Sequence, residues 1–91
     1  MRHFFLSPRR EDYERFRGVM DDRNELHRTF DEWEKAINSQ VAAAKAQGII
    51  LEPVDFDLEK FVAFCRSNNL PCGDRARAHF AASTGRAKNA N

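Results

Sequence analysis

The longest regular pattern of apolar and polar positions runs from Thr29 to Gly48. Its apolar residues recur at steps of three and four and so share one face of a helix: Phe30, Trp33, Ile37, Val41 and Ala44. Thr29 and Glu32 have the spacing of a capping box, and Gly48 stands where a left-handed C-cap residue is expected. The pattern predicts an amphipathic helix of roughly five turns. Trp33 is its largest apolar side chain, so we expect Trp33→Ala to cost roughly 3–5 kcal/mol.

The residues before this helix predict one short strand and one helix. His3 to Leu6 is aromatic and ends at Ser7-Pro8, which favours a strand followed by an N-cap and a first helical proline. A helix from Pro8 to Met20 follows. Residues 21–28 are expected to form a loop with Leu26 packed beneath it, although the spacing of Asp22 and Glu25 also permits the main helix to begin at Asp22.

The residues after Gly48 predict a second strand and a third helix. Three successive branched residues, Ile49-Ile50-Leu51, favour a strand buried on both faces, and Pro53 places its end at a sheet edge. Asp57 is a good N-cap for a helix from Leu58 to about Asn68.

The last predicted helix begins at Asp74 and reaches about Thr84, with Gly85 closing it. Residues 86–91 carry no apolar side chain larger than alanine and are expected to form a disordered tail. The fold class expected is therefore α+β: a single, mostly helical small domain over residues 1–85. Its order is strand-helix-helix-strand-helix-helix, with at most a two-stranded sheet. The sequence leaves open whether the two strands pair with each other.

Composition narrows the class of protein. The chain has 91 residues, is 42% hydrophobic and 32% charged, and carries a net charge of only +1, which is typical of a small globular domain. No stretch approaches the ~20 apolar residues of a membrane span. Two cysteines are too few for a disulfide scaffold, so we expect a cytoplasmic protein.

Several short motifs resemble those of small bacterial proteins of unknown function. They are Thr29-Phe30-Asp31-Glu32-Trp33, Ala46-Gln47-Gly48, Val54-Asp55-Phe56-Asp57, Phe61, Phe64-Cys65-Arg66, Leu70-Pro71 and Arg77-Ala78-x-Phe80-Ala81. The resemblance covers about residues 29–82 and implies a bacterial cytosolic protein. These motifs mark the ends of helices and strands, and the resemblance implies no activity.

The residues give little support for catalysis or metal binding. The possible metal ligands are His3, His27, His79, Cys65 and Cys72. They show no zinc-ligand spacing, so we expect neither a metal nor a cofactor. Cys72 and His79 are the only suggestive nucleophile and base, and no local signature accompanies them. Asp55 and Asp57 are explained by turn and cap formation. We expect a protein that is not an enzyme.

Binding is the class of function that remains. Eight phenylalanines in a small domain suggest a surplus that a partner or a homodimer would cover. The expected contact residues are Phe56, Phe64 and Ile50. We therefore expect a non-enzymatic bacterial accessory protein that acts by protein–protein contact, as a homodimer in which the strands or the Phe56/Phe64 surface are buried. Its partner and biological process cannot be named from the residues.

The alternative is a weak DNA- or RNA-binding module that uses the basic last helix. Its candidate residues are Arg75, Arg77, Arg86 and Lys88. The many alanines of that helix leave few side chains long enough to reach base edges. The acidic residues of the preceding helices would also oppose a phosphate backbone.

Overall fold

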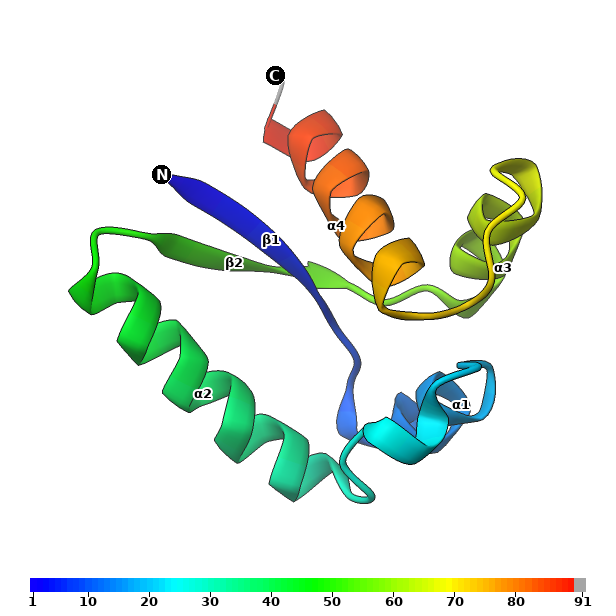
Figure 1. Ribbon diagram of the computed structural model, residues 1–91, viewed down its shortest axis with the longest axis horizontal. Helices are drawn as coiled ribbons and strands as arrows, with labels where there is room; N and C mark the ends of the chain where they lie inside the picture. The colour runs from blue at the N-terminus through cyan, green and yellow to red at the C-terminus, as the bar shows by residue number, and fades with distance from the viewer. Residues whose placement is uncertain (90–91) are drawn as a thin grey trace.

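Two parallel strands lie between helices in the computed structural model, which describes residues 1–89 (Figure 1). The elements are β1 (Arg2–Ser7), the 3-10 turn η1 (Arg10–Asp12), α1 (Tyr13–Gly18), the 3-10 turn η2 (Arg23–Glu25), α2 (Phe30–Ala46), β2 (Ile50–Asp55), α3 (Leu58–Ser67) and α4 (Asp74–Asn89). The protein is thus a small α+β domain with the predicted element order. The strands do pair with each other, which the sequence had left open.

The pairing runs in register from Arg2 opposite Ile50 to Ser7 opposite Asp55. Ladder partners have side chains on the same face of a sheet, so Leu6 and Val54 point to one face together. Both are buried. This face therefore carries the core of the domain.

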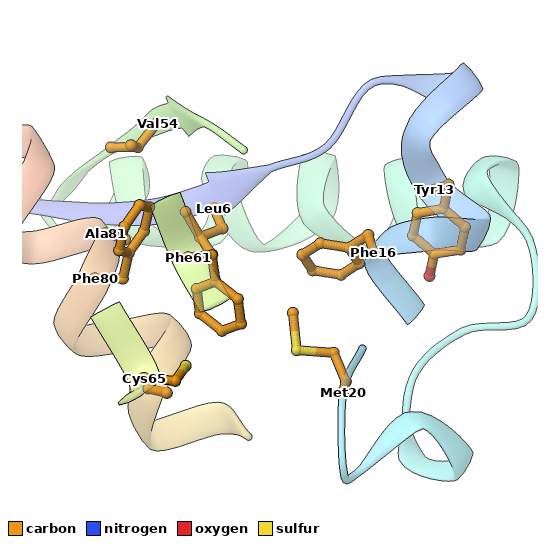
Figure 2. Packing of buried hydrophobic residues seen from close by; sticks show 10 residues of the cluster. Leu6, Tyr13, Phe16, Met20, Val54, Phe61, Cys65, Phe80 and Ala81 are labelled. Atoms are coloured by element: carbon orange, nitrogen blue, oxygen red, sulfur yellow. The ribbon is translucent and has the colours of Figure 1, made fainter. Parts of the chain in front are cut away.

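The core fills the space between this face of the sheet and α1, α3 and α4 (Figure 2). Its buried members are Leu6, Tyr13, Phe16, Met20, Val54, Phe61, Cys65, Ala76, Phe80 and Ala81. Phe61 lies at its centre and is fully buried, with the Phe80 ring 5.5 Å away edge-on and the Phe56 ring 5.9 Å away. Aromatic contacts join α3 to α4, whereas the strands contribute the aliphatic Leu6 and Val54 to this core.

Helix α2 lies on the other side of the strands and is capped as predicted (Figure 1). The Glu32 N–H donates to the Thr29 hydroxyl oxygen at 3.2 Å, and Gly48 adopts the left-handed conformation at φ +79°. The second bond differs from the predicted capping box, because the Thr29 hydroxyl donates to the Glu32 carboxylate at 3.0 Å. The helix begins at Phe30, not at Asp22, and Leu26 is half-buried in the loop before it.

The sequence predicted that Trp33 is a core residue; the structure places it against the periphery of the core and not among the buried members. Trp33 is half-buried, its ring centroid lies 6.2 Å from that of Tyr13, and no residue of α2 is fully buried. The reason is the width of the sheet: two strands about 4.8 Å apart cannot cover the apolar stripe of a 17-residue helix. The stripe is amphipathic as predicted, but much of it stays in contact with solvent.

Two other elements of the structure differ from their predictions. The helix predicted from Pro8 begins as η1 and becomes α1 only at Tyr13, because the Arg9 cap is still extended. The expectation that the second strand is buried on both faces is also wrong: Ile50 is 53% exposed and Pro53 is exposed. Because β2 has only one neighbouring strand and α2 covers its face only partly, β2 remains a partly exposed edge strand.

Helix α4 does not end at Thr84. It continues through Gly85 to Asn89, so residues 86–89 of the predicted tail are helical, and residues 90–91 lie outside the described residues. Gly85 is buried because the Phe4 ring of β1 packs directly against its backbone, where a Cβ would overlap the ring. Gly85 therefore brings the helix and the strand together and does not end the helix.

The cap of α3 gives a first testable prediction. The Lys60 N–H donates to the Asp57 carboxylate at 3.1 Å, as the sequence indicated. Asp57→Ala should lower the free energy of unfolding by about 1 kcal/mol, because a helix N–H loses its acceptor. Asp55→Ala, at the exposed end of β2, should cost less. Urea denaturation of both variants checks the ranking, and the reverse order would contradict this assignment of the cap.

Candidate functional site

A groove runs along the outer edge of β1, between α2 and α4. One part of it is a hollow of about 370 Å³ that residues of β1 line. The lining side chains that β1 and the two helices contribute are Phe4, Phe5, Leu6, Trp33, Ala36, Ile37, Gln40, Arg77 and Ala78. A second hollow, lined by Arg2, His3, Phe4, Ala78, Ala82 and Arg86, shares Phe4 and Ala78 with the first. Together they form one groove along the strand, which we call the β1 groove.

The backbone of β1 faces this groove with unpaired groups. The Ile50 N–H donates to the Met1 carbonyl at 2.8 Å, and the Phe56 N–H donates to the Ser7 carbonyl at 3.4 Å. Bonding residues alternate along a ladder, so the odd-numbered positions of β1 bond to β2. The N–H and C=O groups of Arg2, Phe4 and Leu6 therefore point outward. The β1 groove is an open sheet edge.

The same alternation places Pro53 on the outer edge of β2. Its missing N–H therefore removes no bond from the ladder, as the sequence indicated for an edge position. The two edges of the sheet consequently differ. The β2 edge is blunted by a proline, whereas the β1 edge has a donor at every outward position.

Small apolar side chains form part of each wall of the β1 groove. Ala78 and Ala82 form the α4 side, and Ala36 and Ile37 are half-buried on the α2 side. Small side chains leave room for another backbone to approach the strand. The groove therefore combines unpaired backbone groups with apolar walls.

The end of the groove near the start of β1 is basic. Arg2 forms an ion pair with Glu52 at 3.1 Å and keeps half of its side chain exposed. Arg86 is exposed, and its Nε donates to the Ala82 carbonyl at 3.2 Å; it has no acidic partner among the residues that the structure describes. This end can accept negative charge from a bound molecule.

The opposite end of the groove is fastened by an ion pair between α4 and the loop before η2. Both nitrogens of the Arg77 guanidinium donate to the Asp22 carboxylate, at 2.7 and 2.9 Å. The two side chains are only 17% and 20% exposed. The hydrogen bond from Arg77 lowers the pKa of Asp22 below its usual value. A bidentate, half-buried pair of this kind fixes geometry as well as contributing energy.

We expect the Asp22–Arg77 pair to make stability dependent on pH. A carboxylate with a lowered folded-state pKa stabilises the fold above its unfolded value, about 3.9, and the contribution disappears as pH falls through the folded-state pKa. Asp22→Asn should therefore cost about 1–2 kcal/mol at neutral pH and much less below about pH 3.

Thermal unfolding at several pH values measures this effect. Asp31→Asn is the matched control, because Asp31 pairs with Arg10 at 2.7 Å but both side chains are more than half exposed. That variant should change stability little at any pH. Equal effects of the two substitutions at neutral pH would contradict the structural role of Asp22.

The predicted contact residues occupy different environments. Phe56 packs edge-on against Phe16 with ring centroids 5.0 Å apart, and Phe64 packs edge-on against Phe80 at 5.4 Å. Both are half-buried parts of the core periphery and not a free aromatic surface. Only Ile50 is largely exposed, opposite Arg2 in the ladder. Sequence reasoning missed the outer edge of β1, because strand pairing decides which backbone groups remain free.

The residues of the nucleic-acid alternative are also divided. Arg77 is engaged by Asp22, whereas Arg75 and Arg86 are exposed on α4. The side chain of Lys88 lies outside the part of the chain that is described. Of the candidate arginines, Arg75 and Arg86 are therefore exposed, and Arg77 is held by Asp22. Within residues 1–87, no extended basic face includes Arg77.

Catalytic and metal-binding chemistry finds no assembled site in residues 1–89. No group of three or more His, Cys, Asp or Glu residues could hold a metal ion there. Cys72 lies beside Cys65, and burial, followed by the hydrogen bond with Cys72, raises the pKa of Cys65 to about 11. His79 is exposed, with no hydrogen bond to Cys72. The backbone of Cys72 is held by Asp21, whose N–H donates to the Cys72 carbonyl at 2.7 Å.

None of the helices in the described part of the chain is long and apolar enough to cross a membrane. Comparison with protein-family models, with curated proteins and with solved structures found no match to this chain. The resemblance to small bacterial proteins stays a prediction.

Proposed function

We propose that this protein is a non-enzymatic accessory protein that acts by protein–protein contact through the β1 groove and the adjoining stripe of α2. The observation that carries the proposal is the incomplete cover of this side of the molecule. The 17-residue helix α2 has no fully buried residue, and β1, which lines the groove together with α2, has an open edge. Exposed apolar surface next to an unpaired strand edge is typical of an interaction site.

A bound protein would bury the surface that the chain leaves uncovered. Trp33 and Ile37 are half-buried on the rim of the groove, and Gln40 is exposed one turn further along α2. An aromatic residue flanked by aliphatic and amide side chains is a common composition for the centre of an interface. The bacterial setting rests on the resemblance alone, and the cytosolic one on the resemblance and on the small number of cysteines.

Photo-crosslinking tests this proposal directly. A photoreactive amino acid at Gln40 should give a crosslinked species of defined mass in cells that express the protein. The same amino acid at Ser39, which is exposed on α2 but does not line the groove, should give little of it. Equal or absent crosslinking at the two positions would contradict the proposal.

The predicted homodimer is one form of this contact. Sedimentation equilibrium at tens of micromolar protein distinguishes a dimer from a single species near 10.5 kDa. For a dimer, the species crosslinked through Gln40 should have twice the mass of the chain. A single monomeric species would leave a foreign protein as the partner.

The nucleic-acid alternative has a separate test. Binding of a labelled DNA or RNA duplex through Arg75 and Arg86 should weaken steeply between low and moderate salt. An apolar protein contact should change little over the same range. Salt-sensitive duplex binding without crosslinking at Gln40 would favour the alternative over the proposed function.

A further inference from the structure

The β1 groove has the shape and chemistry of a site for one additional strand. We propose that it binds an extended peptide that pairs antiparallel with β1 and ends in acidic residues. This inference rests on the proposed function and names the kind of partner. It follows from the backbone geometry of the edge, the position of α4 and the charges at the end of the groove.

The backbone supplies the first argument. Arg2, Phe4 and Leu6 direct their N–H and C=O groups toward the groove, and no backbone group outside the strand pair bonds to those of Phe4 or Leu6 within residues 1–89. An added strand would lie about 4.8 Å from β1 and would satisfy these groups in one step. The flanking helices would then cover both faces of the new strand, because α2 and α4 lie on opposite sides of the sheet (Figure 1).

The position of α4 favours a single strand over a second copy of the chain. Helix α4 runs along β1, with the Phe4 ring packed on Gly85, and it contacts β1 more extensively than β2 (Figure 1). Antiparallel pairing of two β1 strands about a twofold axis would put both copies of α4 on one face. The two helices would lie over strands about 4.8 Å apart, whereas packed helices need about 8–10 Å. A peptide without a helix of its own avoids this overlap.

The charges set the direction and composition of the peptide. The start of β1 is flanked by Arg86, which has no acidic partner among the described residues, and by Arg2. An antiparallel peptide brings its C-terminal end to this position. Acidic side chains and a terminal carboxylate there would meet the two guanidinium groups. Toward the middle, Phe4, Trp33 and Ile37 favour apolar side chains on the peptide.

The test uses the full chain and a fluorescent peptide in which valine alternates with threonine and the C-terminal residues are glutamate and aspartate. We expect saturable binding measured by fluorescence anisotropy. Methylation of the peptide nitrogens that face β1 should weaken binding by roughly tenfold or more, because several hydrogen bonds are lost. Methylation of the nitrogens on the other edge should leave binding unchanged. A peptide ending in lysines should bind more weakly.

Variants of the protein provide the matched controls. Ala78→Glu places a longer acidic side chain in the groove from an exposed position of α4, and it should abolish binding. Ala63→Glu makes the same change at an exposed position of α3 that does not line the groove, and binding should persist. Hydrogen exchange gives a second readout: the amides of Phe4 and Leu6 should become protected when the peptide binds.

Each outcome other than those expected contradicts a specific part of the proposal. Equal weakening by methylation on either edge would overturn strand addition. A dimer that Ala78→Glu dissociates, with no peptide binding, would make a second copy the occupant. Failure of the peptide with crosslinking retained at Gln40 would overturn the extended peptide and leave the proposed protein contact intact. Failure of both would overturn both.

Discussion

Phe61→Ala should lower the free energy of unfolding by roughly 3–5 kcal/mol, the largest effect we expect from a single truncation in this chain. Phe61 is fully buried beside Phe80 (Figure 2), and its ring also lies 5.9 Å from that of Phe56, so its loss leaves a cavity between α3, α4 and the segment that joins β2 to α3. A domain of this size has a free energy of unfolding of about 5–15 kcal/mol at most. The variant should therefore be close to unfolded at 37 °C, as circular dichroism during thermal unfolding would detect.

Trp33→Ala is the informative comparison. The sequence pattern predicted a cost of roughly 3–5 kcal/mol for this change, but the side chain is only partly buried. We expect a cost of about 1–2 kcal/mol, since the transfer free energy scales with the area removed from water. If Phe61→Ala does not fold, Phe61→Leu provides a folded variant for the comparison, and it should cost less than about 1.5 kcal/mol. A larger loss for Trp33→Ala than for Phe61→Ala would contradict the position of the core.

Gly85→Leu should cost about 2–3 kcal/mol, the second largest effect. A side chain at this position overlaps the Phe4 ring, so either the ring or the helix must move. In an exposed helix, replacing glycine would instead stabilise the protein by up to about 1 kcal/mol. The two contributions have opposite signs, and steric overlap with an aromatic ring of the strand is the larger one. Chemical denaturation measures the difference.

Gly18→Ala is the matched control for Gly85→Leu. Gly18 ends α1, and nothing lies within 4 Å of the place that its Cβ would take. We expect this variant to be as stable as the wild type or slightly more stable. In addition, Phe4→Ala combined with Gly85→Leu should cost less than the sum of the two single changes, because the leucine fills the space of the ring. Strict additivity would show that Gly85 and Phe4 do not contact each other.

Local patterns were sufficient to predict the elements and several of their ends. The steps of three and four between Phe30 and Ala44 defined α2, and Thr29, Asp57 and Gly48 act through hydrogen bonds or backbone conformations within a few residues. The element order and the α+β class follow from the same patterns. Such features depend on neighbouring residues, and the sequence contains the whole interaction.

The tertiary structure decided how much each element is covered and which groups stay free. Gly85 has the same local pattern as a C-cap, and only the approach of Phe4 from β1 makes it an interior helical residue. Arg77 resembled a free basic residue until Asp22, 55 positions away, proved to be its partner. The open edge of β1 exists because that strand pairs on one side only, and no residue in Arg2–Ser7 specifies which side. Sequence patterns predict which face of an element is apolar. How far the residues of that face are buried depends on the number of strands and helices that pack against it.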